Sequence, residues 1–156
     1  MEIALILASV LMISKIYAEY LTRGTAELCE FKDFLEKMNL RVIAYLNTGA
    51  DFAKSEDFFA LRRVGFIDGL LDASLFEAYS ECMSRLSICN DDRVLLYDFF
   101  KEYGRSDMAT EIGRTEKIIK ALDARCERAR SEIEKKIKVF TSVTLAVMMG
   151  VVILII

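Results

Sequence analysis

The chain has 156 residues, of which 54% are hydrophobic and 29% charged, and its formal net charge is −3. It contains no histidine and no proline, so the commonest general base and metal ligand is missing and no proline interrupts a helix. The negative net charge, without a basic patch interleaved with aromatic residues, excludes nucleic acid as an expected partner.

The first segment, residues 2–21, is predicted to form a short transmembrane helix. It contains an uncharged run at 3–13, after which Lys15 can extend to the membrane interface and Tyr17 and Tyr20 can anchor there. The uncharged part of the segment spans only ~18 Å as a helix. Two alternatives stay open. A signal peptide normally begins with basic residues, whereas the early charge here is negative, and a purely soluble helix would expose many leucine and isoleucine side chains.

Residues 25–138 are predicted to form a cytoplasmic helical bundle. Gly24 is expected to end the first helix and Thr25 to cap the next one, which runs to Asn47. The apolar positions of that next helix alternate in steps of three and four residues, as expected for an amphipathic helix: Leu28, Phe31, Leu35, Met38, Val42 and Tyr45.

A further helix is expected over residues 58–71, with Ser55 as a candidate cap. Gly65 and Gly69 weaken this helix and predict a kink or a split. Their GxxxG spacing is similar to that of a membrane dimer motif, but Asp68 lies between them. The spacing is therefore interpreted as close helix packing within the domain.

Two more helices begin at recognisable caps. Ser74 and Glu77 have the spacing of a capping box, in which a hydroxyl and a carboxylate satisfy backbone donors. The run Asn90-Asp91-Asp92 places negative groups at the positive end of the following helix. Gly104 is expected to close that helix. No strand-like alternation occurs, so the fold class predicted is an all-α bundle of about five to six helices.

The last segment is predicted to be one long helix that continues from the domain into the membrane, with Ser106 or Asp107 as its cap. Residues 139–156 contain no charged side chain and would span ~27 Å as a helix, about the thickness of a bilayer core. They are therefore predicted to form a second transmembrane helix, and the alternative is a buried C-terminal core helix. The apolar stripe before them consists of Ile112, Ile119, Leu122, Cys126, Ala129, Ile133, Ile137 and Phe140.

The basic residues that flank the two predicted membrane helices all lie on the side of the central domain. They are Lys15, Arg23, Lys135, Lys136 and Lys138. The positive-inside rule therefore places the central domain in the cytoplasm and both termini across the membrane.

The four cysteines, Cys29, Cys82, Cys89 and Cys126, show no CxxC spacing and fall among apolar helical neighbours. They are interpreted as small buried side chains in a reducing compartment, with a disulfide framework as the alternative.

No motif in the sequence predicts catalysis, a cofactor or a metal site. A nucleophile paired with histidine cannot form, and neither a phosphate-binding lysine loop nor a GxGxxG run is present. The carboxylates have the spacing of caps and ion pairs. The aromatic pairs at 58–59 and 99–100 are expected in the core. A bundle that binds other proteins and is attached to a membrane fits these features best.

The turn before the last helix carries a family resemblance. Residues 103–107 read Tyr-Gly-Arg-Ser-Asp, and Glu111 follows four residues after the aspartate. With the long charged helix and the apolar tail, this run resembles the stage III sporulation protein AB family, whose turn reads Leu-Gly-x-Ser-Asp with a glutamine four residues on. Residues 74–79 are similar to that family's Ser-Leu-x-x-Ala-aromatic segment. Tyr103 and Glu111 depart from the family pattern.

The resemblance implies a place in the channel-like complex that joins mother cell and forespore in endospore-forming bacteria. It implies a location in the cell membrane on the mother-cell side of the forespore envelope, a helical domain similar to that of the type II secretion platform protein, and partners among the sporulation membrane proteins and the cytoplasmic ATPase of the same operon. It further implies that the turn at 104–107 is structural, with a positive φ at Gly104 and a cap from Asp107, and the alternative is that this turn is a partner surface. Ser106 and Glu111 belong to the same family motif.

Two functions from different classes follow. The first is a non-enzymatic scaffold of the sporulation channel in contact with the lipid bilayer. The alternative is a self-associating pore-forming or holin-like protein, in which Thr141, Ser142 and Thr144 line a bundle. A helical enzyme would need a thiol centre at Cys82 or Cys89 or an acid centre, and the sequence locates neither.

Overall fold

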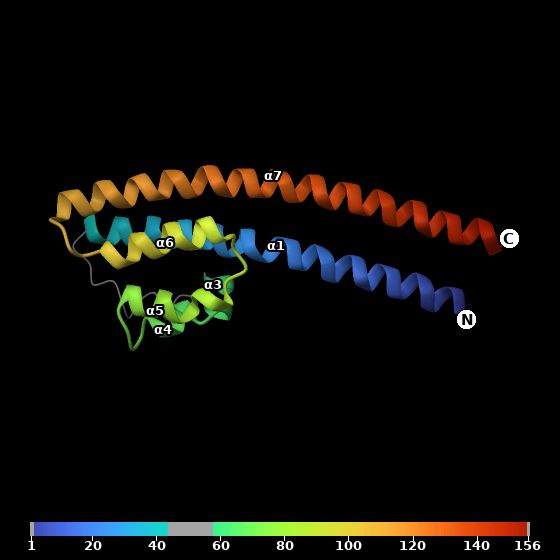
Figure 1. Cartoon of the computed structure of the whole chain (residues 1–156), viewed down its shortest axis with the longest axis horizontal. Helices are drawn as coiled ribbons and strands as arrows, with labels where there is room; N and C mark the ends of the chain where they lie inside the picture. The colour runs from blue at the N-terminus through green and yellow to red at the C-terminus, as the bar shows by residue number, and fades with distance from the viewer. Residues whose placement is uncertain (1, 44–57, 156) are drawn as a thin grey trace. The chain divides into compact units, whose positions relative to one another are not determined.

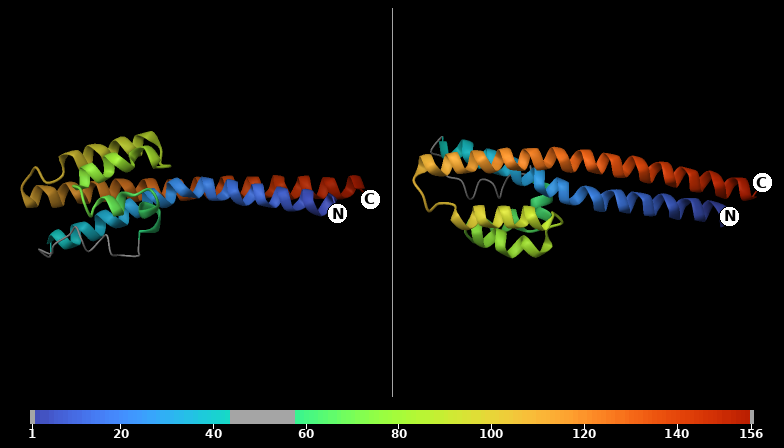
Figure 2. Two further views of the ribbon diagram at one scale, coloured as in Figure 1. Left: turned by 90° about the horizontal axis from the view of Figure 1, so that it is seen from below. Right: turned by 45° about the horizontal axis from the view of Figure 1, so that its top comes forward.

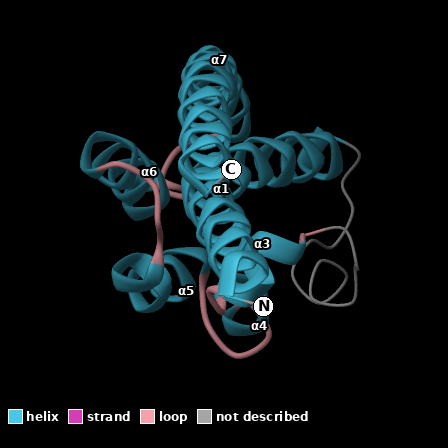
Figure 3. Ribbon diagram, turned by 90° about the vertical axis from the view of Figure 1, so that its right-hand side faces the viewer, coloured by secondary structure: helices cyan, strands magenta, loops and turns pink. Residues whose placement is uncertain are grey.

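The computed structural model describes residues 2–43 and 58–155, and every element within them is helical (Figure 3). The predicted all-α class is therefore confirmed for the described part of the chain. In chain order (Figure 1), the elements are α1 (Glu2–Ile43), α3 (Phe59–Arg63), α4 (Phe66–Gly69), α5 (Leu75–Cys82), the 3₁₀ turn η1 (Met83–Arg85), α6 (Asn90–Glu102) and α7 (Met108–Ile155).

These elements form two compact units. Residues 1–22 and 127–156 form one unit, called here the helix pair, and residues 23–126 form the other, called here the helical domain. In the helix pair, the first part of α1 and the last part of α7 lie side by side and run antiparallel (Figure 2). The helical domain contains α3 to α6 together with the remaining parts of α1 and α7.

The helix pair contains the two segments that were predicted to cross a membrane, residues 2–21 and 139–156. Among the described residues, no helix combines the length and the apolar character that crossing a bilayer requires. The structure thus supports the predicted bundle of helices without supporting the two transmembrane helices. Residues 25–138 as a cytoplasmic domain likewise stay a prediction.

Aromatic rings form the centre of the helical domain. Phe31, Phe66, Tyr79 and Phe100 are almost fully buried, and their ring centroids lie 5.0–6.2 Å apart, mostly at tilted or edge-on angles. Such geometry suits the quadrupoles of neighbouring rings. The expectation that residues 58–59 and 99–100 lie in the core is confirmed with the exception of Phe59, which is 76% exposed.

The part of α7 in the helical domain packs along its predicted apolar stripe. Leu122 and Cys126 are buried and Ile119 packs against the core. Three further positions are buried that the stripe did not include, Glu111, Thr115 and Ile118. Thr115 is accommodated because its hydroxyl donates to the backbone carbonyl of Glu111 at 2.8 Å, which satisfies a polar group that would otherwise be costly to bury.

The prediction that Gly24 ends the first helix is wrong, because α1 continues without a break from Glu2 to Ile43 and Thr25 caps nothing. The glycine has a different role. A Cβ atom at Gly24 would lie 2.6 Å from the backbone oxygen of Ser87, so only glycine lets the helix pass this close to the neighbouring backbone. The structure does not describe residues 44–57, so the predicted helix end at Asn47 and the predicted cap at Ser55 lie outside the described residues.

The predicted split of the helix over 58–71 is confirmed. Gly65 has a φ of 84° and separates α3 from α4, a conformation that glycine adopts without strain. The predicted close packing at Gly69 is also confirmed, because a Cβ there would lie 3.2 Å from the Cβ of Ala78 on α5.

The predicted starts of α5 and α6 are confirmed. Ser74 and Glu77 form the complete capping box, and α6 begins at Asn90 with Asp91 and Asp92 in its first turn. The two bonds from the Ser74 amide and hydroxyl hold the pKa of the exposed Glu77 carboxyl below its ordinary value.

All four cysteines are free thiols in the structure, and the reducing compartment stays a prediction. Cys82 and Cys126 are buried as expected and Cys29 is half-buried, but Cys89 is exposed. Cys89 differs because it is the N-cap residue of α6, in extended backbone just outside the helix.

Candidate functional site

The turn that joins α6 to α7 contains the residues of the sequence resemblance, Gly104, Ser106, Asp107 and Glu111. Gly104 has a φ of 80°, which confirms the conformation implied by the resemblance. Asp107 is the cap of α7, because its carboxylate accepts from the amide of Thr110 at 3.1 Å and from the Thr110 hydroxyl at 2.7 Å. These bonds lower the pKa of the Asp107 carboxyl from its ordinary value.

Glu111, in the first turn of α7, also bonds to the turn. Its carboxylate accepts from the backbone amide of Ser106 at 3.1 Å, so the side chain holds the residue before the cap. Glu111 is 7% exposed, and its second carboxylate oxygen has no hydrogen-bond partner among the described residues. Burial and the nearby Glu111 charge raise the pKa of the Tyr103 phenol. Tyr103 and Glu111 both depart from the family pattern, and the Glu111 charge acts on the Tyr103 phenol.

A second polar cluster was not predicted from the sequence. Glu27 on α1 is 1% exposed. Its two carboxylate oxygens accept from the Arg63 guanidinium at 3.0 Å and from the backbone amide of Ser87 at 2.5 Å. The sequence does contain a signal, since Glu27 lies four residues before Phe31 and so shares the apolar face of its helix.

Glu30, also on α1, caps a different helix. Its carboxylate oxygens accept from the backbone amides of Ala60 and Leu61, each at 2.9 Å. Helix α3 has no side-chain cap of its own. The carboxylate therefore supplies the acceptors and the negative charge that the first turn of a helix needs.

The third polar cluster joins α6 to α7. Asp92 is buried and forms a short ion pair with Arg125. The same carboxylate accepts from the Cys89 thiol at 3.0 Å. Burial and this hydrogen bond raise the pKa of Cys89, and burial raises the pKa of Cys82 to about 12. Because the thiolate is the reactive form of cysteine, neither residue has the environment of a nucleophile.

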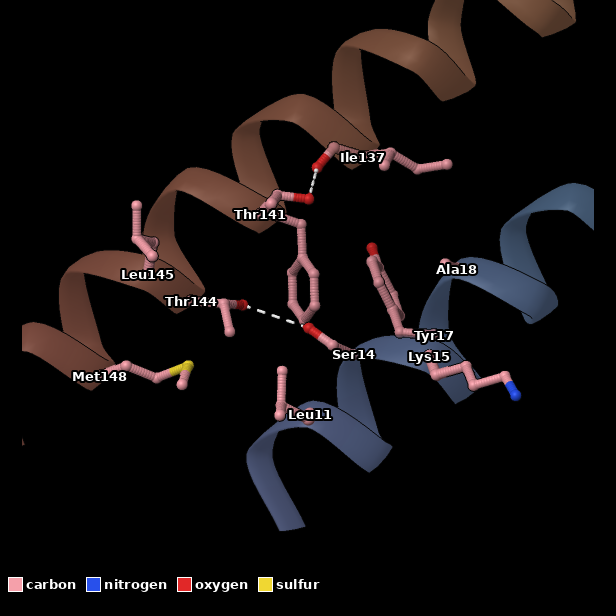
Figure 4. A pocket seen from close by; sticks show the side chains of 11 residues that line it. Leu11, Ser14, Lys15, Tyr17, Ala18, Ile137, Thr141, Thr144, Leu145 and Met148 are labelled. Atoms are coloured by element: carbon pink, nitrogen blue, oxygen red, sulfur yellow. Dashed lines mark hydrogen bonds between the residues drawn. The ribbon is translucent and has the colours of Figure 1, made fainter. Parts of the chain in front are cut away.

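The helix pair contains a cavity of about 350 Å³ between α1 and α7 (Figure 4). At its base, the hydroxyls of Ser14 and Thr144 lie 3.3 Å apart. Beside it, the rings of Tyr17 and Phe140 pack with centroids 4.7 Å apart. The walls are mostly apolar, and Lys15 points away from the cavity at its rim.

The hydroxyls predicted to line a pore have partners within the helix pair. Thr144 faces Ser14, while Thr141 and Ser142 donate to the carbonyls of Ile137 and Lys138 at 2.8 and 2.9 Å. Back-bonding of this kind satisfies a hydroxyl in an apolar helix without a second chain. No observation therefore favours the pore-forming alternative, which stays a prediction.

The five basic residues predicted to flank a membrane are all exposed, and they divide between the two units. Arg23 belongs to the helical domain. Lys15 lies on α1 in the helix pair, and Lys135, Lys136 and Lys138 lie on α7 in the same unit. Lys135 and Lys136 line a second cavity there together with Tyr17.

The described residues contain no group of acidic, histidine or cysteine side chains that could hold a metal ion. The polar clusters pair each carboxylate with a backbone amide, an arginine or a thiol, and so they position helices. None of them places an activated nucleophile beside a base.

Comparison with known proteins gives one finding. The family model of the stage III sporulation protein AB family matches residues 70–156, more than half of the chain. No curated protein and no solved structure matches the chain significantly. The matched range includes α5, α6, the Gly104–Asp107 turn and all of α7, and the chain therefore belongs to the stage III sporulation protein AB family.

Proposed function

We propose that the chain is a non-enzymatic membrane scaffold of the channel complex between mother cell and forespore. In this proposal, the helix pair is embedded in the cell membrane on the mother-cell side of the forespore envelope. The helical domain lies in the cytoplasm, where it contacts other proteins of the complex and the cytoplasmic ATPase of the same operon. Membership of the sporulation protein family supports a role in sporulation. The apolar surface of the helix pair supports the membrane location.

The observation that carries the membrane location is the distribution of exposed apolar side chains. Most of the large hydrophobic residues that are exposed in the described part of the chain belong to the helix pair. They are Leu11, Met12, Ile13, Ile16, Tyr17, Tyr20, Val139, Val143, Leu145, Val147, Met149 and Ile153, with exposed fractions from 41% to 71%. A surface of this extent is unusual for a protein in water and fits contact with lipid or with another protein.

The charge distribution supports the orientation. Residues 139–156 carry no charge, whereas Lys135, Lys136 and Lys138 come directly before them. Lys15 follows the uncharged run 3–13 of α1. Basic residues are retained on the cytoplasmic side of membrane segments, and this pattern supports the proposed cytoplasmic side for the helical domain.

Fractionation of sporulating cells tests the membrane location. The full chain should stay with the membrane after carbonate extraction at high pH, and its helical domain should resist protease added outside intact cells. Cys89 supplies a built-in reporter because the residue is exposed, and labelling at mildly alkaline pH offsets the raised pKa of its thiol. An impermeant thiol reagent should label Cys89 only after the cells are opened, with a Cys89→Ser chain as the control. Release into the soluble fraction would contradict the proposal.

Affinity purification from the same cells tests the scaffold role. The tagged chain, extracted in mild detergent, should recover sporulation membrane proteins and the ATPase. Recovery of none of them would contradict the proposal. Ion conductance of the purified chain in liposomes would favour the pore-forming alternative in its place.

A further inference from the structure

We infer that the helix pair carries a binding site for one anionic phospholipid. Lys135, Lys136 and the Tyr17 hydroxyl would hold the phosphate, and a row of valines on α7 would hold an acyl chain. The inference rests on the proposed membrane location of the helix pair, and it adds a specific ligand to it.

The site is a cavity of about 380 Å³ in the helix pair, lined by Tyr17, Lys135, Lys136, Val139, Phe140 and Val143. The packed rings of Tyr17 and Phe140 form a wall that this cavity shares with the one in Figure 4. Its volume lies within the roughly 300–1,000 Å³ typical of ligand pockets. The cavity therefore has room for part of a lipid against a firm aromatic wall.

The lining changes from charged to apolar along one face of α7. Lys135, Val139, Val143 and Val147 follow at intervals of four residues, which places them on one face of a helix. The three valines are 65%, 56% and 52% exposed. The face thus presents an ammonium group first and hydrocarbon after it, the same order as the headgroup and tail of a phospholipid.

The two lysines form no ion pair with a described residue, and the nearby exposed carboxylates of Glu132 and Glu134 do not line the cavity. The ion pair on this part of α7 joins Arg130 to Glu127 at 3.2 Å. The charged residues that line the cavity are these two lysines. An anionic group is therefore the complementary ligand, and the Tyr17 hydroxyl can donate a hydrogen bond to it.

An anionic phospholipid fits this surface better than two other occupants. Free phosphate would use the lysines but would leave the valines beside them exposed. A second copy of the helix pair would bring the same two lysines against this face, and like charges repel. A phospholipid uses both the charge and the hydrocarbon.

The test is a lipid titration of the purified full chain in detergent. Short-chain phosphatidylglycerol and phosphatidylcholine of equal tail length are added separately, and bound lipid is counted by native mass spectrometry. We expect phosphatidylglycerol to bind at least tenfold more tightly. Replacing both lysines (Lys135→Gln with Lys136→Gln) should lower its affinity roughly 30-fold, about fivefold per lysine near a lipid surface.

The matched control replaces two exposed lysines elsewhere on α7, Lys117→Gln with Lys120→Gln, and should leave lipid affinity unchanged. A tail variant, Val143→Asn, should weaken phosphatidylglycerol binding several-fold. Circular dichroism of each variant confirms that the helices are intact. Equal binding of the two lipids, or unchanged binding after loss of Lys135 and Lys136, would overturn the inference. Displacement of the lipid by millimolar inorganic phosphate would also overturn it and indicate a free-phosphate site.

The lipid site and the proposed membrane location can be disproved independently of each other. If the chain leaves the membrane fraction of cells, the membrane location is wrong, whatever the lipid titration gives. If the chain stays in the membrane but binds both lipids equally, only the phospholipid site is wrong. The two results therefore identify which statement has failed.

Discussion

The helical domain and the helix pair are built from the same two long helices, but the domain buries its apolar side chains and the helix pair exposes many of them. In the helical domain, α1 and α7 contribute Phe31 and Leu122 to a closed aromatic core, and buried carboxylates such as Glu27 have partners. In the helix pair, the same helices carry exposed apolar residues such as Ile16 and Val147. The difference shows that a helical period fixes which residues share a face, while the surroundings decide whether that face is buried or exposed.

The largest effect should come from the aromatic core. Phe66→Ala removes a ring that is fully buried and contacts three others, so the free energy of unfolding should fall by about 3–5 kcal/mol. Urea denaturation of the full chain, followed by circular dichroism, measures this. Phe59→Ala is the control, because Phe59 is largely exposed and should change stability by less than about 0.5 kcal/mol. Similar losses for the two variants would mean that the core is not where the fold places it.

A charge introduced into the helix pair should affect membrane association without affecting the stability of the helical domain. Val147→Asp should leave the stability of the helical domain unchanged and weaken membrane association, since an aspartate in the middle of an inserted helix costs about 2.5–3.5 kcal/mol. Carbonate extraction measures the bound fraction. Val94→Asp, on an exposed valine of α6, is the matched control and should remain bound. Equal retention of both variants in the membrane fraction would contradict the assignment of membrane contact to the helix pair.

Loss of the Glu27 carboxylate tests the buried polar cluster. Glu27→Ala leaves the Ser87 amide without its acceptor and Arg63 without its partner, so stability should fall by about 1–3 kcal/mol. Arg63→Ala should cost a similar amount, because it leaves the buried Glu27 carboxylate without its counter-charge. Thermal unfolding of both variants measures the two effects, and an unchanged unfolding temperature for either variant would contradict the role of this cluster.

Glycines on either side of the α7 start should respond with opposite signs. Gly104→Val should destabilise the domain on the order of 1–2 kcal/mol, because φ is positive there. An added Cβ would have no other atom within 4 Å, so the cost comes from the backbone conformation and not from a clash. Gly113→Ala, at an equally open position inside α7, should stabilise by about 0.5–1 kcal/mol. Equal unfolding temperatures for the two variants would show that the turn is not strained.

The smallest effect concerns pH. Bonds from Thr110 lower the pKa of Asp107 in the folded state, so its contribution is present above the ordinary carboxyl pKa and is lost as the pH falls through the lowered value. Asp107→Ala should therefore destabilise the chain at neutral pH and lose this part of the acid dependence. Urea midpoints measured at several pH values give the comparison. An unchanged pH profile in the variant would assign the cap to another residue.

The sequence predicted the features that depend on near neighbours. The capping box at Ser74, the split at Gly65, the cap at Asp107 and the apolar stripe of α7 all involve residues within one or two helical turns. The features it missed depend on segments far apart. The role of Gly24 comes from the Ser87 backbone, and the burial of Glu27 comes from Arg63 and Ser87. No local pattern contains these partners, so the sequence predicted a helix end at Gly24 and made no prediction for Glu27.

The carboxylate of Glu30 at the start of α3 has a consequence for how the chain folds. A helix of five residues cannot nucleate alone in water, and α3 relies on acceptors that belong to a residue thirty positions earlier. During synthesis α1 is made first, so the anchor exists before the segment that needs it. Formation of α3 then depends on its packing against α1 and not on the helix propensity of its own residues. The amide protons of Ala60 and Leu61 should therefore exchange with solvent as soon as α1 moves away.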